Sequence, residues 1–261
     1  MSKKIRRVRF KSTHNNLLNQ LLNQLPEHLR GLGKNFSVEQ VKELLTVSDM
    51  THFIKHHFDI DIHEEKLEAA TSNSCRKVIV GGRRTGKTFY LVQDILYKAF
   101  TSTYKKIVVC GSHKYYIKEI FDRIRETIHS NHIIEQKVIR EASIPFYELE
   151  FDNGSRIRGI DIKARGSLFE QNADHIYIDE FSRCNKRVFV NTILPILQVT
   201  PETTLTMVGS PPSDENWIPE DLELFDRYYW PGQADENQRI FYTPEGWSRG
   251  IRGIWNGYTR S

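Results

Sequence analysis

The sequence predicts an α/β fold in which a mostly parallel central sheet is flanked by helices. Short β-branched runs alternate with helical patterns from Arg76 onward. A glycine-rich loop, GGRRTGKT, joins the first of these runs to an amphipathic helical pattern. Runs rich in Val and Ile, without polar alternation, are typical of strands that helices cover on both faces of a sheet.

The composition is that of a globular protein that can bury a core of its own. The chain has 261 residues, of which 39% are hydrophobic and 27% are charged, and its mean hydropathy is −0.51. Its apolar runs are shorter than the roughly 20 residues of a membrane-spanning helix. Its basic N-terminus lacks the apolar stretch of a secretory signal. We therefore expect no membrane span and a cytoplasmic location.

The net charge and the cysteines narrow the class of site. A net charge of +4 favours polyanionic partners only weakly. The three cysteines have no CxxC spacing, so they support neither a disulfide framework nor a zinc module.

Residues 1–70 are predicted to form an N-terminal helical appendage. Leucines within residues 14–25 have the spacing of an amphipathic helix. A second helix is predicted to begin at Ser37, where Gln40 completes the pattern of a capping box. A third helix is predicted from Asp49 to Phe58.

Residues 71–215 are predicted to form the core of the fold, and residues 216–261 a small lid or linker. Two β-rich runs, FYELEF and SRIRGI, flank the pair Asn153-Gly154. Asn-Gly supplies the positive φ angles of a tight turn, so these runs predict a β-hairpin. The β-branched runs predicted as strands of the core sheet are residues 77–80, 106–110, 175–179 and 204–209.

The loop GGRRTGKT fits the phosphate-binding pattern G-x-x-x-x-G-K-[ST] in full, between the strand and the helix that such a loop requires. Backbone N–H groups and a helix N-terminus bind phosphates there because glycine keeps side chains out of the way. Lys87 is predicted to neutralise the β- and γ-phosphates, and the Thr88 hydroxyl to ligate Mg²⁺. The predicted nucleotide-binding residues are Gly81, Gly82, Arg83, Arg84, Thr85, Gly86, Lys87 and Thr88.

The acidic pair at the end of HIYIDE is predicted to complete the site, because it follows a buried strand downstream of the loop. Asp179 is predicted to hold Mg²⁺, directly or through water, and Glu180 to polarise the attacking water. The alternative is that both carboxylates merely cap the next element. ATP is the predicted nucleotide, because the Asn185-Lys186 pair lacks the aspartate of a guanine-reading N-K-x-D motif.

Two further segments narrow the class of ATPase. The run FDNGSRIRGI leads through DIKARGSLFEQNADHIYIDEF to the acidic strand, and TLTMVGSPPS follows later. With the loop, residues 63–215 resemble the ATPase domain of viral large terminase subunits, the motors that move double-stranded DNA into preformed capsids. The resemblance implies a P-loop NTPase of the additional-strand catalytic-glutamate class. Helicases share the loop and acidic motifs, so a helicase-like or other nucleic-acid-dependent ATPase is the alternative. A non-hydrolysing, ATP-gated assembly module is the second.

The resemblance also assigns roles to arginines. Arg83 has the place of a loop arginine that the family often carries, where a guanidinium binds γ-phosphate oxygens in the transition state. Arg84 either reaches another subunit or a carboxylate, or stays in solvent. Arg165 is expected to act as an arginine finger toward the neighbouring subunit's ATP; the alternative is a local salt bridge. The predicted catalytic residues are Glu180, Lys87, Arg83 and Arg165.

Ser210 and Pro211 match the coupling motif of the same family, a strand that ends in a small hydroxyl residue and proline. The Ser210 hydroxyl is expected to sense the γ-phosphate and to shift the segment that follows. The alternative is an ordinary turn at the end of a strand.

The resemblance implies ATP and Mg²⁺ as ligands, and a homo-oligomeric ring on a capsid portal protein. Double-stranded DNA and the small terminase subunit are the other expected partners, in the cytoplasm of a phage-infected bacterium and at the procapsid. The family often reads adenine with a glutamine upstream of the loop, but the stretch DIHEEKLEAA has none. Too few residues follow Ser210 for the family's usual C-terminal nuclease, so we expect no nuclease activity in this chain.

Overall fold

The computed structural model divides the chain into two compact units, Met1–Ile62 and His63–Ser261. The structure describes residues 17–25, 30, 36–82, 84–144, 146–162, 172–210 and 225–230. No helix within these residues is long and apolar enough to cross a bilayer.

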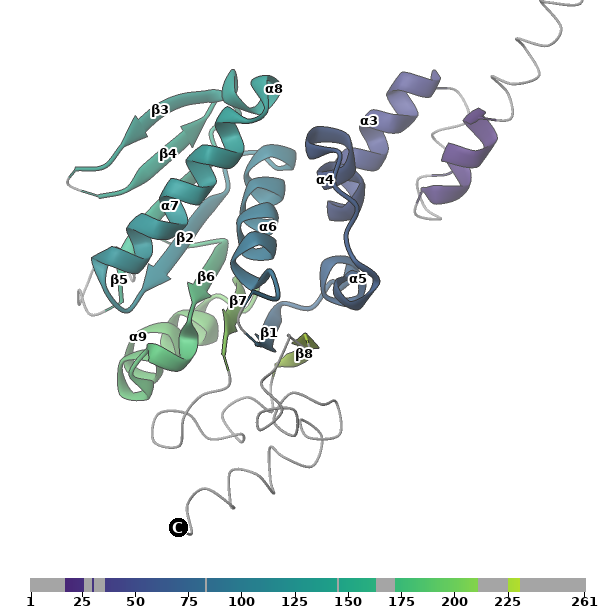
Figure 1. Cartoon of the computed structure of the whole chain (residues 1–261). Helices are drawn as coiled ribbons and strands as arrows, with labels where there is room; N and C mark the ends of the chain where they lie inside the picture. Colours follow the sequence, from purple (N-terminus) through teal and green to yellow (C-terminus); the bar gives the residue numbers. More distant parts are fainter. Residues whose placement is uncertain are drawn as a thin grey trace, which may run out of the picture. The chain divides into compact units, whose positions relative to one another are not determined.

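The described residues of the first unit form mainly helices (Figure 1). Residues 17–24 are helical, and Leu18, Leu21 and Leu22 pack with Val41 and Leu45 of α3 (Val38–Ser48). Ser37 caps α3 through the predicted capping box with Gln40. The carboxylate of Asp49 caps α4 (Met50–Phe58) by accepting from backbone N–H groups in its first turn. All three helical predictions are therefore confirmed.

The second unit contains an eight-stranded sheet in the order β3-β4-β5-β2-β6-β7-β1-β8 (Figure 1). Strands β1, β2, β5, β6, β7 and β8 are parallel, and β4 is antiparallel to both β3 and β5. Strand β7 lies between β1, which leads into the glycine-rich loop, and β6, which leads into the acidic pair. The predicted mostly parallel sheet with an additional strand is therefore confirmed. The strands are β1 (Arg76–Gly81), β2 (Lys106–Gly111), β3 (Val138–Ala142), β4 (Glu148–Phe151), β5 (Arg156–Asp161), β6 (His175–Asp179), β7 (Thr204–Gly209) and β8 (Asp226–Trp230).

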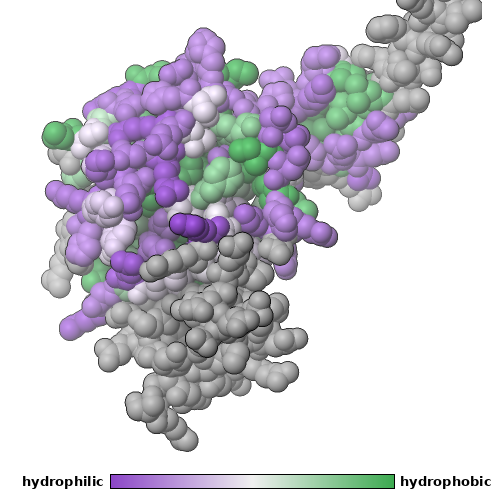
Figure 2. Space-filling view, in the orientation of Figure 1, coloured by the Kyte–Doolittle hydropathy of each residue, from purple (hydrophilic) through white to green (hydrophobic). Residues whose placement is uncertain are grey.

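Helices cover both faces of this sheet. The apolar residues of α6 (Lys87–Thr101) and α7 (Lys114–His129) face the strands. The polar residues of α7 contribute to the hydrophilic outer surface (Figure 2), whereas Gln93 and Asp94 of α6 are buried. On the other face, α9 (Lys186–Val199) packs on the sheet (Figure 1). Shorter elements complete the unit: α5 (Glu64–Thr71), α8 (His132–Glu135) and the 3₁₀ turn η2 (Phe181–Arg183).

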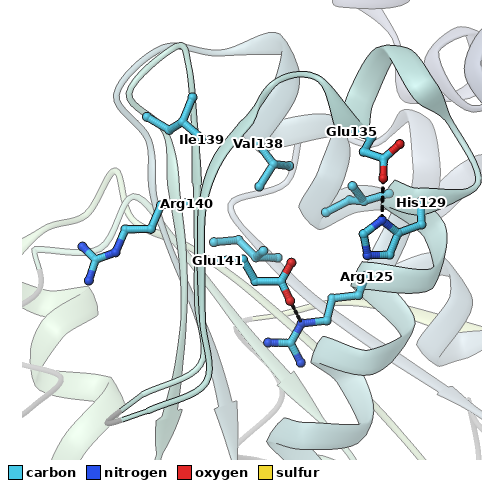
Figure 3. A pocket seen from close by; sticks show the side chains of 9 residues that line it. Arg125, His129, Glu135, Val138, Ile139, Arg140 and Glu141 are labelled. Carbon is cyan, nitrogen blue, oxygen red and sulfur yellow. Dashed lines mark hydrogen bonds and ion pairs between the residues drawn. The ribbon is translucent and has the colours of Figure 1, made fainter.

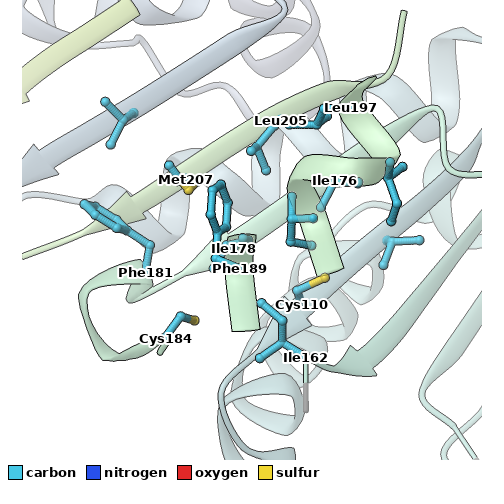
Figure 4. Close-up of a cluster of buried hydrophobic side chains, with 14 of the residues drawn as sticks. Cys110, Ile162, Ile176, Ile178, Phe181, Cys184, Phe189, Leu197, Leu205 and Met207 are labelled. Carbon is cyan, nitrogen blue, oxygen red and sulfur yellow. The ribbon is translucent and has the colours of Figure 1, made fainter. Parts of the chain in front are cut away.

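The core under α9 shows why the central strands read as continuous apolar runs. Alternate residues of each strand face α9, and those between them face α6 and α7, so both faces of each strand need apolar side chains. The cluster under α9 is fully buried and joins the strands to η2 and α9 (Figure 4). Its members include Cys110, Ile176, Ile178, Phe181, Cys184, Phe189, Leu205 and Met207.

The predicted hairpin is present, with Asn153-Gly154 between β4 and β5. Gly154 has a φ of +80°. The Asn153 side chain donates to the carbonyls of Ala99 and Ser102 at 2.8 and 2.7 Å, and so bonds the turn to the end of α6.

The predicted domain limits differ from the compact units in two places. The second unit begins at His63 rather than at residue 71, because α5 contacts β8. Part of the segment predicted as a lid or linker, Asp226–Trp230, is an edge strand of the core sheet. Strands β3 and β8 were not among the predicted strands.

Candidate nucleotide-binding site

The predicted site lies at the edge of the sheet where the central parallel strands end. The loop that follows β1 leads into α6, which begins at Lys87 with Gly86 as its N-cap. Asp179 is the last residue of β6, and the strand between β6 and β1 is β7. Because parallel strands end at the same edge, the fold brings the loop and the acidic pair together.

Lys87 is buried inside the loop, with 6% of its surface exposed. Its ammonium donates to the carbonyl oxygens of Gly81 and Gly82 at 2.8 and 2.6 Å. Burial lowers the pKa of Lys87, against the charges of Glu180 and Asp179, which raise it. Within the described residues, the loop therefore holds a desolvated cation whose hydrogen-bond acceptors are neutral carbonyls, and a phosphate is the stronger acceptor.

Thr88 and Asp179 join the two halves of the site directly. The Thr88 hydroxyl donates to a carboxylate oxygen of Asp179 at 3.0 Å. Burial, followed by the charge of Glu180, raises the pKa of Asp179 to about 6. A hydroxyl and a desolvated carboxylate are hard oxygen donors side by side, which fits the ligand chemistry of Mg²⁺.

Glu180 follows the strand in a left-handed backbone conformation, with a φ of 48°. Its N–H group donates to the carboxylate of Asp179 at 2.9 Å, and its carbonyl accepts from the N–H of Arg183 at 2.8 Å. A residue other than glycine rarely adopts this conformation, which costs about 1 kcal/mol or more. Hydrogen bonds on both sides of the residue hold the turn that places Glu180 beside the loop.

The remaining loop residues shape the backbone. Gly86 has a φ of +83°, and a side chain on Gly81 would lie 2.6 Å from the carbonyl oxygen of Trp230. The Thr85 hydroxyl donates to the carbonyl of Gly82 at 3.1 Å. Arg84 is exposed and has a φ of 62°.

Ser210, the residue of the coupling prediction, lies at the edge of the sheet where the central strands end. It directly follows β7, whose Gly209 pairs with Val80 and whose Val208 pairs with Asp179. This register places half-buried Ser210 between the start of the loop and the acidic pair. Arg83, Arg165 and Pro211 lie outside the described residues.

Sequence reasoning missed two residues that approach the loop. Trp230 ends β8 beside Gly81, and Lys66 on α5 reaches Gly86. The run DRYYW has the aromatic content of a strand, so β8 had a signal. Lys66 had none, since a lysine on a short polar helix looks like any solvated cation.

A hollow elsewhere in the unit does not involve these residues. It has a volume of about 220 Å³ between α7, α8 and the edge strand β3 (Figure 3). Its charged groups are largely paired with one another: Arg125 contacts Glu141 at 2.5 Å, and His129 contacts Glu135 at 2.8 Å. This pairing leaves little charge to attract a phosphate.

The raised pKa of Asp179 predicts how the stability of the metal- and nucleotide-free protein changes with pH. The pKa of Asp179 is about 6 in the folded protein and 3.8 for an ordinary aspartate, so its contribution to stability is present at low pH and lost as the pH rises through 6. An Asp179→Asn variant should not lose this stability, because the asparagine amide does not ionise. Between pH 5 and pH 8 the wild type should lose about 1.4 kcal/mol of unfolding free energy relative to the variant.

Urea unfolding at the two pH values measures this difference. Asp122→Asn is the control, because the hydrogen bond from Lys118 lowers the pKa of Asp122, which stays ionised over this range. Equal pH dependence of wild type and Asp179→Asn would show that the Asp179 carboxyl is not desolvated.

Comparisons with known proteins agree with this geometry. The family model described as terminase large subunit, T4likevirus-type, N-terminal, matches residues 78–225. No curated protein matches the sequence. Among solved structures, the large terminase ATPase domain of Thermus phage P74-26 is similar, with a TM-score of 0.60 and 15% identity over 78% of this chain and 98% of that one.

The large terminase of bacteriophage HK97 is similar with a TM-score of 0.57 and 14% identity over 82% of this chain. The match spans 52% of the HK97 protein, so this chain corresponds to about half of its length. At such identities the structural likeness shows the shared fold, and the family model, which covers more than half of the chain, shows the family. The chain therefore belongs to the family of phage large terminase subunits, and the match is to the N-terminal part of that family.

Proposed function

We propose that this chain hydrolyses ATP to drive double-stranded DNA into a viral procapsid. The observation that carries the proposal is the hydrogen bond from Thr88 to Asp179, at 3.0 Å, with Glu180 as the next residue. It joins a phosphate-binding loop to an acidic strand, in a chain whose family is that of large terminase subunits. The side chains proposed for phosphate binding, metal binding and water activation thus lie close together.

The residues of the loop would bind and orient the nucleotide. The Lys87 ammonium would exchange the carbonyls of Gly81 and Gly82 for phosphate oxygens, and the N-terminus of α6 would add backbone N–H groups. Thr88 and Asp179 would hold Mg²⁺, which, when bound, neutralises charge on the phosphates. Bound Mg²⁺ would also give the Asp179 carboxylate a cation partner, and so favour the ionised form that burial now disfavours.

Glu180 would act as the general base. It lies one residue beyond Asp179, in a turn with a positive φ whose N–H group donates to the Asp179 carboxylate. From there it would orient a water molecule for attack on the γ-phosphate and accept its proton.

Ser210 and the arginines would connect hydrolysis to movement. Ser210 lies between the loop and the acidic pair, so loss of the γ-phosphate would change its surroundings first. Arg83 would stabilise charge on the γ-phosphate, and Arg165 would do so from the neighbouring subunit. Mixing Arg165→Ala subunits with Lys87→Ala subunits tests the second role: partial recovery of turnover supports it, and none in a normally assembled ring opposes it.

In this function, copies of the chain would assemble into a homo-oligomeric ring in the host cytoplasm. The partners proposed for it are a capsid portal protein, the small terminase subunit and double-stranded DNA. Family membership supports these partners. We likewise propose that this chain has no nuclease activity.

The test separates a packaging motor from a helicase-like ATPase. We expect blunt double-stranded DNA to raise the rate of phosphate release more than single-stranded DNA of the same length, with no strand separation in a displacement assay. Preferential stimulation by single strands together with strand displacement would contradict the motor and favour the helicase-like alternative.

A further inference from the structure

We propose that Lys66, on α5, binds the phosphate chain of the nucleotide as a second lysine of the site. The inference rests on the proposed function, because it assumes that the glycine-rich loop binds a nucleotide. Lys66 lies outside the loop motif, fifteen positions before Gly81, and the sequence pattern gives it no role. The structure supplies the reason to assign one.

The ammonium of Lys66 occupies the space that the absent side chain of Gly86 leaves open. A Cβ atom built on Gly86 would lie 2.8 Å from Lys66 Nζ and 3.8 Å from its Cε. Gly86 is the N-cap of α6, at the point where the loop turns into the helix. A glycine at this point allows a ligand to approach the backbone closely, so the Lys66 ammonium stands where the phosphates of a nucleotide would pass.

Trp230 holds the lysine in this place. The Lys66 ammonium lies 5.6 Å from the centre of the Trp230 ring, within the range of a cation–π contact. Trp230 is 1% exposed, packs edge-on against Tyr90 of α6, and contacts Gly81 through its backbone. Strand β8 thus supplies a fixed aromatic surface that keeps the Lys66 ammonium at the loop before any nucleotide binds.

The charge of Lys66 has no competing partner among the side chains that the structure describes. Within those residues no carboxylate forms an ion pair with Lys66. By contrast, each of four other lysines pairs with an aspartate: Lys55, Lys105, Lys118 and Lys137. An ammonium that faces an anion-binding loop with only an aromatic ring as its partner is available to a phosphate. Its three donors also fit phosphate oxygens better than the mixed donors and acceptors of an adenine edge.

The two lysines would contact the phosphates from different sides. Lys87 lies inside the loop, against the carbonyls of Gly81 and Gly82, whereas Lys66 approaches Gly86 from α5. The contact from Lys66 would add to the affinity that Lys87 provides. Removal of Lys66 should therefore weaken binding of every ligand that has a phosphate chain.

The experiment compares Lys66→Met, which keeps most of the apolar stem and removes the charge, with Lys66→Arg, which keeps the charge. Dissociation constants for ATP, GTP and inorganic tripolyphosphate are measured by calorimetry on the full chain. We expect Lys66→Met to weaken all three by about tenfold, the loss of one charge-assisted hydrogen bond in a partly exposed site. Lys66→Arg should stay within about threefold of wild type for the same reason.

Lys106→Met is the matched control, because Lys106 is exposed at the start of β2 and belongs to no part of the site. It should leave all three affinities unchanged. A Lys66→Met loss confined to ATP, with tripolyphosphate spared, would overturn the inference in favour of a role at the base. Unchanged affinities in Lys66→Met, with wild-type binding intact, would overturn it while leaving the proposed function standing. If the wild type binds none of the three ligands, the proposed function itself fails.

Discussion

A Glu180→Gln variant is expected to bind ATP about as well as the wild type and to release phosphate at least ~10²-fold more slowly. The amide has the shape of the carboxylate but cannot accept the proton of the attacking water. Glu180 is half-buried and its backbone is held on both sides by hydrogen bonds, so the substitution should leave the turn intact. Single-turnover phosphate release and equilibrium ATP binding, measured on the same preparation, separate the two effects.

Glu202→Gln is the control for this variant. Glu202 is exposed in the turn before β7, at the N-terminal end of that strand, whereas Glu180 follows the C-terminal end of β6. It should hydrolyse ATP at the wild-type rate. Unchanged turnover in Glu180→Gln would remove Glu180 from the reaction, and lost ATP binding would assign it to affinity instead.

A Lys87→Ala variant is expected to lose roughly 10²-fold in ATP affinity and nearly all turnover. The lysine is the desolvated cation at the centre of the loop, and its loss leaves buried carbonyls and an acidic pair facing the phosphates. Repulsion between the phosphates and those carboxylates adds to the lost attraction. Calorimetry with ATP, together with phosphate release, measures both losses.

Unfolding of the nucleotide-free variant must be checked in the same experiment. Lys87 is buried with neutral partners, so its removal should change thermal stability much less than affinity. Lys114→Ala, at the exposed start of α7, should change neither quantity. A folded Lys87→Ala variant that binds ATP normally would place the nucleotide elsewhere.

The central part of the fold and both halves of the site were predictable from local sequence. The runs that form β1, β2, β6 and β7 are apolar on both faces, which a buried parallel strand requires. The loop and the acidic pair have residue types that phosphate and metal binding dictate. Their meeting also followed, because parallel strands bring their carboxyl ends to one edge.

Other features depend on contacts between segments far apart in the chain. Strand β8 pairs with β1 across more than half of the sequence, and no local pattern specifies that register. The position of Lys66 follows from that pairing, since Trp230 is its described partner. The left-handed turn at Glu180 was equally hidden, because glutamate has no intrinsic preference for a positive φ.

The most direct test of this account is the turnover of ATP by the purified wild-type chain with Mg²⁺ and double-stranded DNA. We predict repeated phosphate release, many molecules of ATP per chain, that requires Mg²⁺ and disappears in the Lys87→Ala variant. Tight binding of ATP under the same conditions without release of phosphate would contradict an ATP-driven motor, and would make the chain an ATP-gated assembly module.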